Sequence, residues 1–352
     1  MDYTTDTSIP TFMYQLNSSG SIIKSPTGWN TTIPAIVFLT TIIILGIVGN
    51  SHALYIYTER FKSQNKQRRD RNNTYVVLVI SLACLDIFTC LVILPQDDSL
   101  PMQFIPVSES KCIFTIYLQY TVHVSSLIHI VLISIHCWRM VCHPHARQIK
   151  ERDALICCIV FHILSAVSCL PVVFVAGYNT LIINGEMVSG CGITENGLRS
   201  MISKICVGLL GTYFFLSFII ICSTYVSLII NRMQKGNRFT TNSLSEEEEL
   251  QKARKNAGIL ITITVLFVIA YIPFIILAGI NVFVTEFEKN LQAPVAAVCL
   301  LFIKFPFLNN VVNPFVYGFR DGEFRQKLQQ MYRCKKGEDN NAENIQSSIE
   351  LV

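Results

Sequence analysis

Seven long apolar stretches, separated by shorter polar segments, dominate the chain. They cover residues 33–57, 75–94, 112–141, 154–176, 202–230, 257–283 and 293–317. A helix needs about 20 apolar residues to cross roughly 30 Å of hydrocarbon. Lipid offers no hydrogen-bond partners to the backbone, so each stretch must satisfy its own as a helix. The pattern therefore predicts an all-α membrane protein with a seven-helix bundle rather than the buried helices of a soluble enzyme.

Composition agrees with this interpretation. The 352 residues are 51% hydrophobic and only 15% charged, whereas soluble domains carry about 25% charged residues. Most of the thirteen cysteines lie inside apolar stretches, where cysteine behaves as a small buried hydrophobe. Two cysteines differ in context: Cys112 opens a stretch, and Cys191 lies in a polar loop. Nothing in the pattern indicates catalysis or a nucleic-acid partner.

The basic residues predict the orientation in the plasma membrane. Lys and Arg crowd into the segments 58–74, 142–153 and 231–256, and such loops stay on the cytoplasmic side. This places residues 1–32 outside as a tail, 33–318 in the seven-helix domain, and 319–352 inside. Residues 1–32 lack the apolar core of a cleavable signal, so the first helix is expected to act as a signal anchor. Sequons at Asn17 and Asn30 predict glycosylation of the outer tail.

A carboxylate lies inside the second apolar stretch. Asp86 has no basic residue near it in sequence, and ionisable groups within spans are costly and usually functional. One hypothesis is a bound Na⁺ held by Asp86 together with Ser126, Asn309 and Asn313. The alternative is a protonated Asp86 that is hydrogen-bonded in the core. Apart from this ion, no cofactor is expected.

The third stretch has a polar face. Gln119, His123 and Ser126 follow one another at i, i+4 and i+7, so they share one side of a helix. Such a face is expected to line an internal site. A neutral histidine bonded to a backbone carbonyl is an equally good interpretation of His123 alone. Metal binding is not expected, because no carboxylate or cysteine completes a ligand set.

Two prolines interrupt stretches that are otherwise helical. Pro273 and Pro314 each remove a backbone hydrogen bond and favour a kink. Kinked helices beside a polar interior provide hinges, the mechanical element that a receptor needs. A fixed kink without motion is the alternative.

These motifs together resemble the rhodopsin-like (class A) G-protein-coupled receptors over residues 33–331. The matching segments are Gly49-Asn50, Leu82-Ala83-x-x-Asp86, Phe267-x-x-Ala270-Tyr271-Ile272-Pro273 and Asn313-Pro314-Phe315-Val316-Tyr317. The resemblance implies a disulfide between Cys112 and Cys191, which also suits an oxidising exterior. It further implies that activation is relayed by Phe267, Tyr271, Pro273, Tyr225, Asn313, Pro314 and Tyr317.

One departure from the family concerns coupling. The Asp-Arg-Tyr motif appears here as His136-Cys137-Trp138, so Cys137 replaces the arginine that contacts the G protein. Arg139 lies two residues further on, about 200° around the helix. The main expectation is a receptor that signals through a heterotrimeric G protein, an arrestin or both. An arrestin-biased or scavenging receptor is the first alternative, and a transporter is disfavoured because no paired halves are seen.

The ligand is expected to be a peptide. Gln119 stands where amine receptors carry aspartate, and Phe307 stands where opsins carry lysine. Asn184-Gly185 between apolar flanks predicts a two-residue hairpin, which resembles the second outer loop of peptide receptors. The expected ligand contacts are Gln119, His123, Tyr271 and Lys304. Snorkelling of Lys304 toward the surface is the alternative for that residue.

A short amphipathic helix follows the seventh stretch. Phe324, Leu328 and Met331 recur at i, i+4 and i+7 among charged residues, a pattern typical of a helix on the cytoplasmic membrane surface. Cys334, just beyond it, is a predicted palmitoylation site. The expectation from sequence is a multi-pass receptor with an eighth helix, and not an enzyme.

Overall fold

The computed structural model describes most of the predicted bundle. It covers residues 14–16, 22–24, 26–66, 73–97, 100, 108–143, 146–183, 186–193, 198–235, 258, 262–263, 265–280 and 293–333. The helices are α1 (Pro26–Lys66), α2 (Thr74–Phe88), α3 (Glu109–Cys142), α4 (Glu151–Ser168), α5 (Leu198–Lys235), α7 (Ala293–Lys304) and α8 (Asn309–Arg320). Between α5 and α7 lies a further apolar helix, Val265–Ile280.

The helices match the seven predicted stretches. Six of them are long and apolar enough to cross a membrane, and Val265–Ile280 is a shorter piece of the predicted sixth span. The first apolar span begins at Ile33, as predicted, although α1 itself begins at Pro26. The all-α bundle is therefore confirmed for the part that lies within the membrane.

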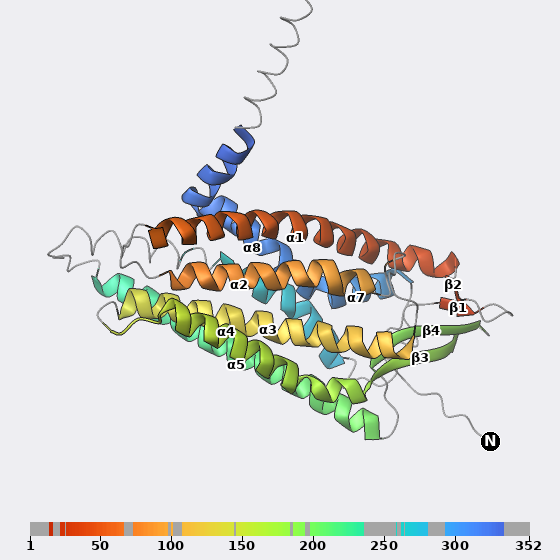
Figure 1. The fold of residues 1–352 in the computed structure, drawn as a ribbon. Helices are drawn as coiled ribbons and strands as arrows, with labels where there is room; N and C mark the ends of the chain where they lie inside the picture. Colours follow the sequence, from red (N-terminus) through yellow and green to blue (C-terminus); the bar gives the residue numbers. More distant parts are fainter. Residues whose placement is uncertain are drawn as a thin grey trace, which may run out of the picture.

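The helices lie side by side along one axis, and the two ends of the bundle differ (Figure 1). Four strands gather at one end, called here the sheet end. At the opposite end, called here the tail end, the chain leaves α8 as a final short helix, residues 322–333.

The sheet has the strand order β2-β1-β4-β3. Strands β3 (Ala176–Ile183) and β4 (Glu186–Ile193) pair antiparallel, with Ile183 opposite Glu186. This register confirms the predicted hairpin with its two-residue connection, although Asn184 and Gly185 themselves lie outside the described residues. Strands β1 (Tyr14–Leu16) and β2 (Ile22–Lys24) extend the sheet from the chain's beginning. The sequence did not predict these two, so a small β layer is added to the all-α expectation.

Irregular backbone occurs at three places that differ from the predicted kinks. α2 continues as a π-helical segment, Thr89–Ile93, and a 3-10 turn, Leu94–Gln96. A second 3-10 segment, Leu170–Phe174, follows α4, and a third, Phe305–Leu308, separates α7 from α8. Pro95, Pro171 and Pro306 lie in these turns, whereas Pro273 and Pro314 lie within continuous helix. A proline near the start of a turn of helix lacks only a hydrogen bond that would be unsatisfied anyway, so it marks the break.

The final helix rests its apolar side on the bundle. Phe324 is 3% exposed, and Leu328 and Met331 pack, partly buried, against the main core. The apolar face predicted from the i, i+4, i+7 spacing therefore packs at least partly against the protein core.

The close approach of α1 to α8 depends on a glycine. A Cβ on Gly49 would lie 2.9 Å from the Cβ of Pro314.

Candidate functional site

An aromatic and polar cluster occupies the interior below the sheet end. The Tyr271 hydroxyl and His123 Nδ1 are hydrogen-bonded at 3.2 Å, which joins the helix Val265–Ile280 to α3. The Phe267 ring stacks on Tyr271 with centroids 4.2 Å apart. His123 also lies 4.9 Å from the Phe307 ring in the turn before α8. Three spans thus meet at His123, a predicted ligand contact, while Tyr271 itself is only 2% exposed.

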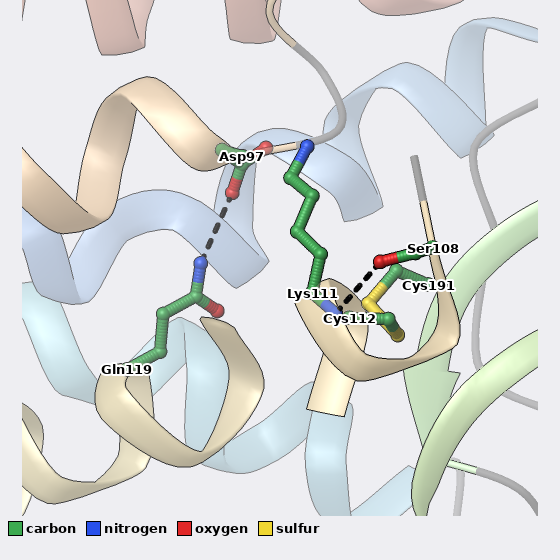
Figure 2. Close-up of a disulfide and its surroundings, with 6 residues drawn as sticks. All are labelled: Asp97, Ser108, Lys111, Cys112, Gln119 and Cys191. Carbon is green, nitrogen blue, oxygen red and sulfur yellow. Dashed lines mark hydrogen bonds between the residues drawn. A yellow bond between two sulfur atoms is a disulfide. The ribbon is translucent and has the colours of Figure 1, made fainter. Parts of the chain in front are cut away.

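A buried ion pair lies next to this cluster. Lys304, the last residue of α7, pairs with the carboxylate of Asp97, which ends the 3-10 turn after α2. Gln119 Nε2 donates to the same oxygen, Asp97 Oδ2, at 3.4 Å, as Figure 2 shows. The exposed fractions of the Asp97 and Lys304 side chains are 3% and 13%. Two predicted ligand contacts, Gln119 and Lys304, therefore converge on a carboxylate that sequence reasoning missed.

The missed aspartate left a faint signal in the sequence. Asp97 follows Pro95-Gln96, and a proline at that position predicts the end of a helix near the membrane surface. A polar residue is unremarkable there. Only the fold brings it across to Lys304, 207 residues away.

The predicted disulfide anchors the hairpin over this region. Cys112 and Cys191 are bonded, with their Cα atoms 5.5 Å apart. Cys112 lies in the first turn of α3, where Ser108 Oγ caps the helix by accepting a hydrogen bond from the Lys111 backbone N–H at 3.2 Å. In Figure 2 the Lys111 side chain extends from the same turn in the direction of Asp97. Strand β4 is thereby fixed to α3 close to the ion pair.

A second polar cluster lies deeper in the bundle around Asp86. Asn313 Nδ2 donates to Asp86 Oδ2 at 2.9 Å, and both residues are fully buried. Among the described residues, Asp86 Oδ1 has no hydrogen-bond partner, nor have the side-chain oxygens of Asn309 and Asn313. Ser126 on α3 is 2% exposed. The structure thus joins Asp86 to Asn313, and carboxylate and amide oxygens are ligands that hard cations prefer.

The predicted relay residues lie along the core of the bundle. The Tyr271 ring stacks on Phe214 of α5, with centroids 6.0 Å apart. At the tail end, Tyr317 packs edge-on against Tyr57 of α1 at 5.4 Å. Tyr225 of α5 is half-buried against the same main core cluster that contains Phe267 and Tyr317.

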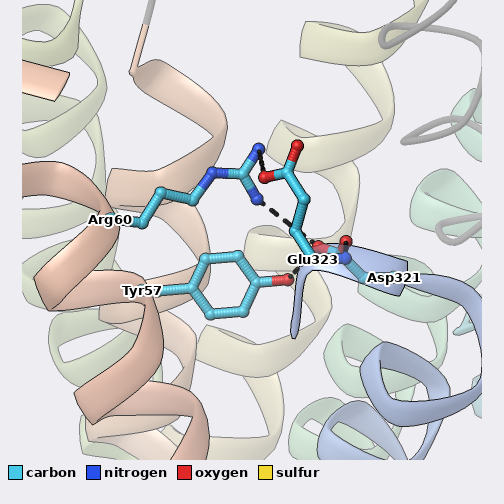
Figure 3. A network of polar contacts seen from close by, with 4 residues as sticks. All are labelled: Tyr57, Arg60, Asp321 and Glu323. Atoms are coloured by element: carbon cyan, nitrogen blue, oxygen red, sulfur yellow. Dashed lines mark hydrogen bonds and ion pairs between the residues drawn. The ribbon is translucent and has the colours of Figure 1, made fainter. Parts of the chain in front are cut away.

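A polar clamp joins α1 to the final helix at the tail end. Asp321 Oδ2 accepts hydrogen bonds from Tyr57 and Arg60, at 3.1 and 3.4 Å (Figure 3). Arg60 Nη2 forms an ion pair with Glu323 at 3.0 Å, and Asp321 Oδ1 accepts the backbone N–H of Glu323 at 3.1 Å. Asp321 therefore caps the final helix while it holds that helix against α1.

The tail end of α3 shows where Cys137 and its neighbours lie in the structure. Cys137 is 3% exposed and belongs to the main core. Trp138 Nε1 donates to Ser227 Oγ of α5 at 2.9 Å. The Arg139 guanidinium donates to the backbone carbonyl of Arg147. No arginine therefore stands in the interior at position 137, and Arg139 is directed to the loop instead.

Some predicted sites fall where the structure is silent. Asn17 and Cys334 lie outside the described residues, and Asn30 falls within α1 without a described side chain. Glycosylation and palmitoylation stay predictions.

Comparisons with known proteins agree with this architecture. Residues 56–317 match the protein family described as 7 transmembrane receptor (rhodopsin family). Somatostatin receptor type 5 of Bos taurus is 22% identical over 333 residues, which cover 92% of this chain and 82% of that receptor. Somatostatin receptor type 1 of Rattus norvegicus is 22% identical over 310 residues, or 86% and 72% of the two chains. The neuromedin U receptor homolog nmur-2 of Caenorhabditis elegans is 24% identical over 323 residues, or 83% and 77%.

Proposed function

This chain belongs to the rhodopsin family of seven-transmembrane receptors, and on that premise we propose that it is a plasma-membrane receptor for an extracellular peptide. The sheet end faces outside and the tail end faces the cytoplasm. The basic segments 58–74, 142–153 and 231–256 support this orientation, because loops rich in Lys and Arg stay inside.

The observation that carries the proposal is the polar network beneath the disulfide-anchored hairpin. A peptide offers charged groups, backbone amides and apolar side chains together. The network offers a cation and an anion in Lys304 and Asp97, an amide in Gln119, and aromatic rings around His123. The names of the somatostatin and neuromedin U receptors support the same ligand class.

Transmission of the signal is proposed to be a population shift between two packings of one bundle, not a chemical reaction. A ligand group that bonds to His123 or Tyr271 competes with the hydrogen bond between them. Loss of that bond frees the helix Val265–Ile280 from α3, and the stacked Phe267 ring moves with Tyr271. The shift is only as large as the ligand's preference for the second packing.

Asp86 and its neighbours are proposed to hold Na⁺ in the resting packing. The oxygens of Asp86, Asn309 and Asn313 that find no partner in the described part of the chain support this, because buried polar atoms without a partner are rare unless an ion or water completes them. Ser126 would supply the hydroxyl ligand from α3. The ion would contribute positive charge opposite the buried carboxylate.

Coupling is proposed to reach a heterotrimeric G protein through side chains other than an arginine at position 137. The burial of Cys137 supports a second candidate, an arrestin-biased receptor, because a small buried thiol presents no cation to a transducer.

The deciding experiment is a signalling screen with a library of peptides and small metabolites in cells that express the full chain. G-protein activation and arrestin recruitment are recorded in parallel for wild type and Cys137→Arg, with untransfected cells as the control. A wild-type G-protein response to a peptide supports the first candidate and identifies the ligand. Arrestin recruitment alone, with G-protein activation only in Cys137→Arg, supports the second. A response confined to non-peptide ligands refutes the peptide assignment.

A further inference from the structure

Two buried cations flank one carboxylate beneath the hairpin. Lys304 forms an ion pair with Asp97, and their side chains are 13% and 3% exposed. Lys111, in the first turn of α3, is 7% exposed, and its side chain extends toward Asp97 in Figure 2. Buried charges are costly unless opposite charges or hydrogen bonds compensate them. Counted over these three described side chains, the cluster carries one net positive charge.

A further carboxylate in the same turn of α3 does not compensate this charge. Glu109 lies two residues before Lys111, and residues two apart point about 200° away from each other around a helix. Glu109 is also exposed, whereas Lys111 is buried. Its carboxylate therefore lies on the other side of the helix from the cluster.

The hydrogen-bonding groups that the cluster still has to offer are mostly donors. A lysine ammonium has three N–H groups, and an amide nitrogen has two. Within the described part of the chain, Lys304 donates only to Asp97 Oδ2, and Gln119 Nε2 donates only to the same oxygen. Two N–H groups of Lys304 and one of Gln119 are thus left for another acceptor. Asp97 is the more deeply buried partner, so the accessible side of the pair is its cation.

We propose that this cluster receives a carboxylate of the peptide ligand. The inference rests on the peptide-receptor function proposed above and specifies the group that anchors the peptide. A ligand carboxylate at Lys304 neutralises the net positive charge and accepts the N–H groups that Lys304 and Gln119 still offer. Hydrogen bonds of this charge-assisted kind are roughly twice as strong as neutral ones. A ligand ammonium would instead meet two buried lysines, Lys111 and Lys304.

Matched peptides test the inference by removing one charge at a time. Each peptide that activates wild type in the signalling screen is made again with its C-terminus amidated, and separately with Asn and Gln in place of Asp and Glu. Loss of the anchoring carboxylate is expected to weaken the potency between roughly tenfold and hundredfold, the range of one hydrogen bond to a charged group. The form that loses potency shows whether the carboxylate belongs to the C-terminus or to a side chain.

Receptor variants locate the effect at Lys304. The readout is the ratio of the potencies of the carboxylate and neutral forms on the same receptor, so differences in surface level between variants cancel. Lys304→Met is expected to lower this ratio by roughly tenfold to hundredfold, and Lys304→Arg, which keeps the charge, to retain it. Gln119→Glu adds a carboxylate beside the cation without deleting it and is expected to lower the ratio as well. Lys204→Met, at an exposed lysine of α5, is the matched control and is expected to keep the wild-type ratio.

The outcomes distinguish failure of this inference from failure of the proposed function. A screen without a peptide agonist in any form refutes the peptide-receptor function, and the inference with it. Peptide agonists that keep their full potency in both neutral forms overturn the inference alone. A carboxylate preference that survives in Gln119→Glu, and in Lys304→Met where that variant reaches the surface, overturns it too, because the carboxylate then binds elsewhere.

Discussion

Removing the cation of the Asp97–Lys304 pair is expected to destabilise the receptor through the charge that stays behind. In Lys304→Met the apolar stem is kept, but the Asp97 carboxylate, 3% exposed, loses the ammonium. Breaking a buried pair by deleting one partner typically costs about 3–5 kcal/mol. The Gln119 donor at 3.4 Å stays in place, and Lys304 is 13% exposed, so the lower end, about 3 kcal/mol, applies here.

The double variant isolates the physical cause. Asp97→Asn together with Lys304→Met removes both charges and leaves a neutral amide beside Gln119. If the cost comes from a buried carboxylate that has lost the Lys304 ammonium, the double variant is more stable than Lys304→Met alone. Replacing a whole buried pair by neutral groups is often nearly neutral. The coupling between the two changes is then expected to exceed 1 kcal/mol, within the range of roughly 0.5–3 kcal/mol seen for contacting residues.

Thermal unfolding in detergent micelles measures these changes. A thiol-reactive dye reports unfolding, because many of the chain's free cysteines, such as Cys90, Cys137 and Cys158, are buried. Lys204→Met, at an exposed lysine of α5, is the matched control and is expected to unfold with wild type. Equal midpoints for Lys304→Met and wild type, or simple additivity in the double variant, would refute the reasoning.

Four further predictions concern the other contacts. Cys112→Ser removes a disulfide between residues 79 apart in sequence. By loop entropy it is expected to lower the free energy of unfolding by about 4.5 kcal/mol, seen as a loss of folded receptor at the cell surface. Unchanged surface levels would contradict this. Gly49→Val, whose Cβ would lie 2.9 Å from Pro314, is expected to lower stability by about 1–3 kcal/mol, whereas Gly208→Ala, with no atom within 4 Å, is not. Arg60→Ala removes the ion pairs to Asp321 and Glu323. A double-cysteine variant, His52→Cys with Tyr332→Cys, reports whether the final helix still lies against α1, because the parent side chains are 2.9 Å apart. Adding Arg60→Ala to that variant is expected to reduce disulfide formation, and undiminished crosslinking would mean that the clamp does not hold the final helix. If Asp86 helps to bind Na⁺, the unfolding midpoint of wild type is higher in NaCl than in choline chloride, and Asp86→Asn is expected to abolish that difference. A difference that survives in the variant would place the ion elsewhere.

Much of the fold was predictable because membrane insertion acts on local sequence. A stretch of apolar residues has to form a helix in lipid whatever surrounds it. The hairpin was predictable for a similar reason, since Asn-Gly adopts the required turn locally. The breaks at Pro95 and Pro306 were missed because proline kinks, begins or ends a helix depending on where the neighbouring helices allow the chain to bend. Strand β1 was missed because its partner, β4, lies more than 160 residues away, and β2 was missed with it because β2 pairs only with β1 in the described sheet.

The candidate site divides in the same way. Motifs singled out Asp86, Asn313, Phe267 and Tyr271, and the structure joins Asp86 to Asn313 and Phe267 to Tyr271. The sequence did not single out Asp97, because an aspartate at the end of a span looks like an ordinary solvated residue. The structure turns Asp97 into the partner of two predicted ligand contacts, Lys304 and Gln119.

The sequence by itself determined the seven spans, their predicted orientation and the family motifs, since each depends on the composition of one short segment. Only the tertiary structure decided that Lys304 pairs with Asp97, that Asp321 clamps α1, and that His162 stacks on His129. In each case the partners come from different helices. Their contact depends on how those helices rotate and approach one another, and the packing of the whole bundle sets that geometry.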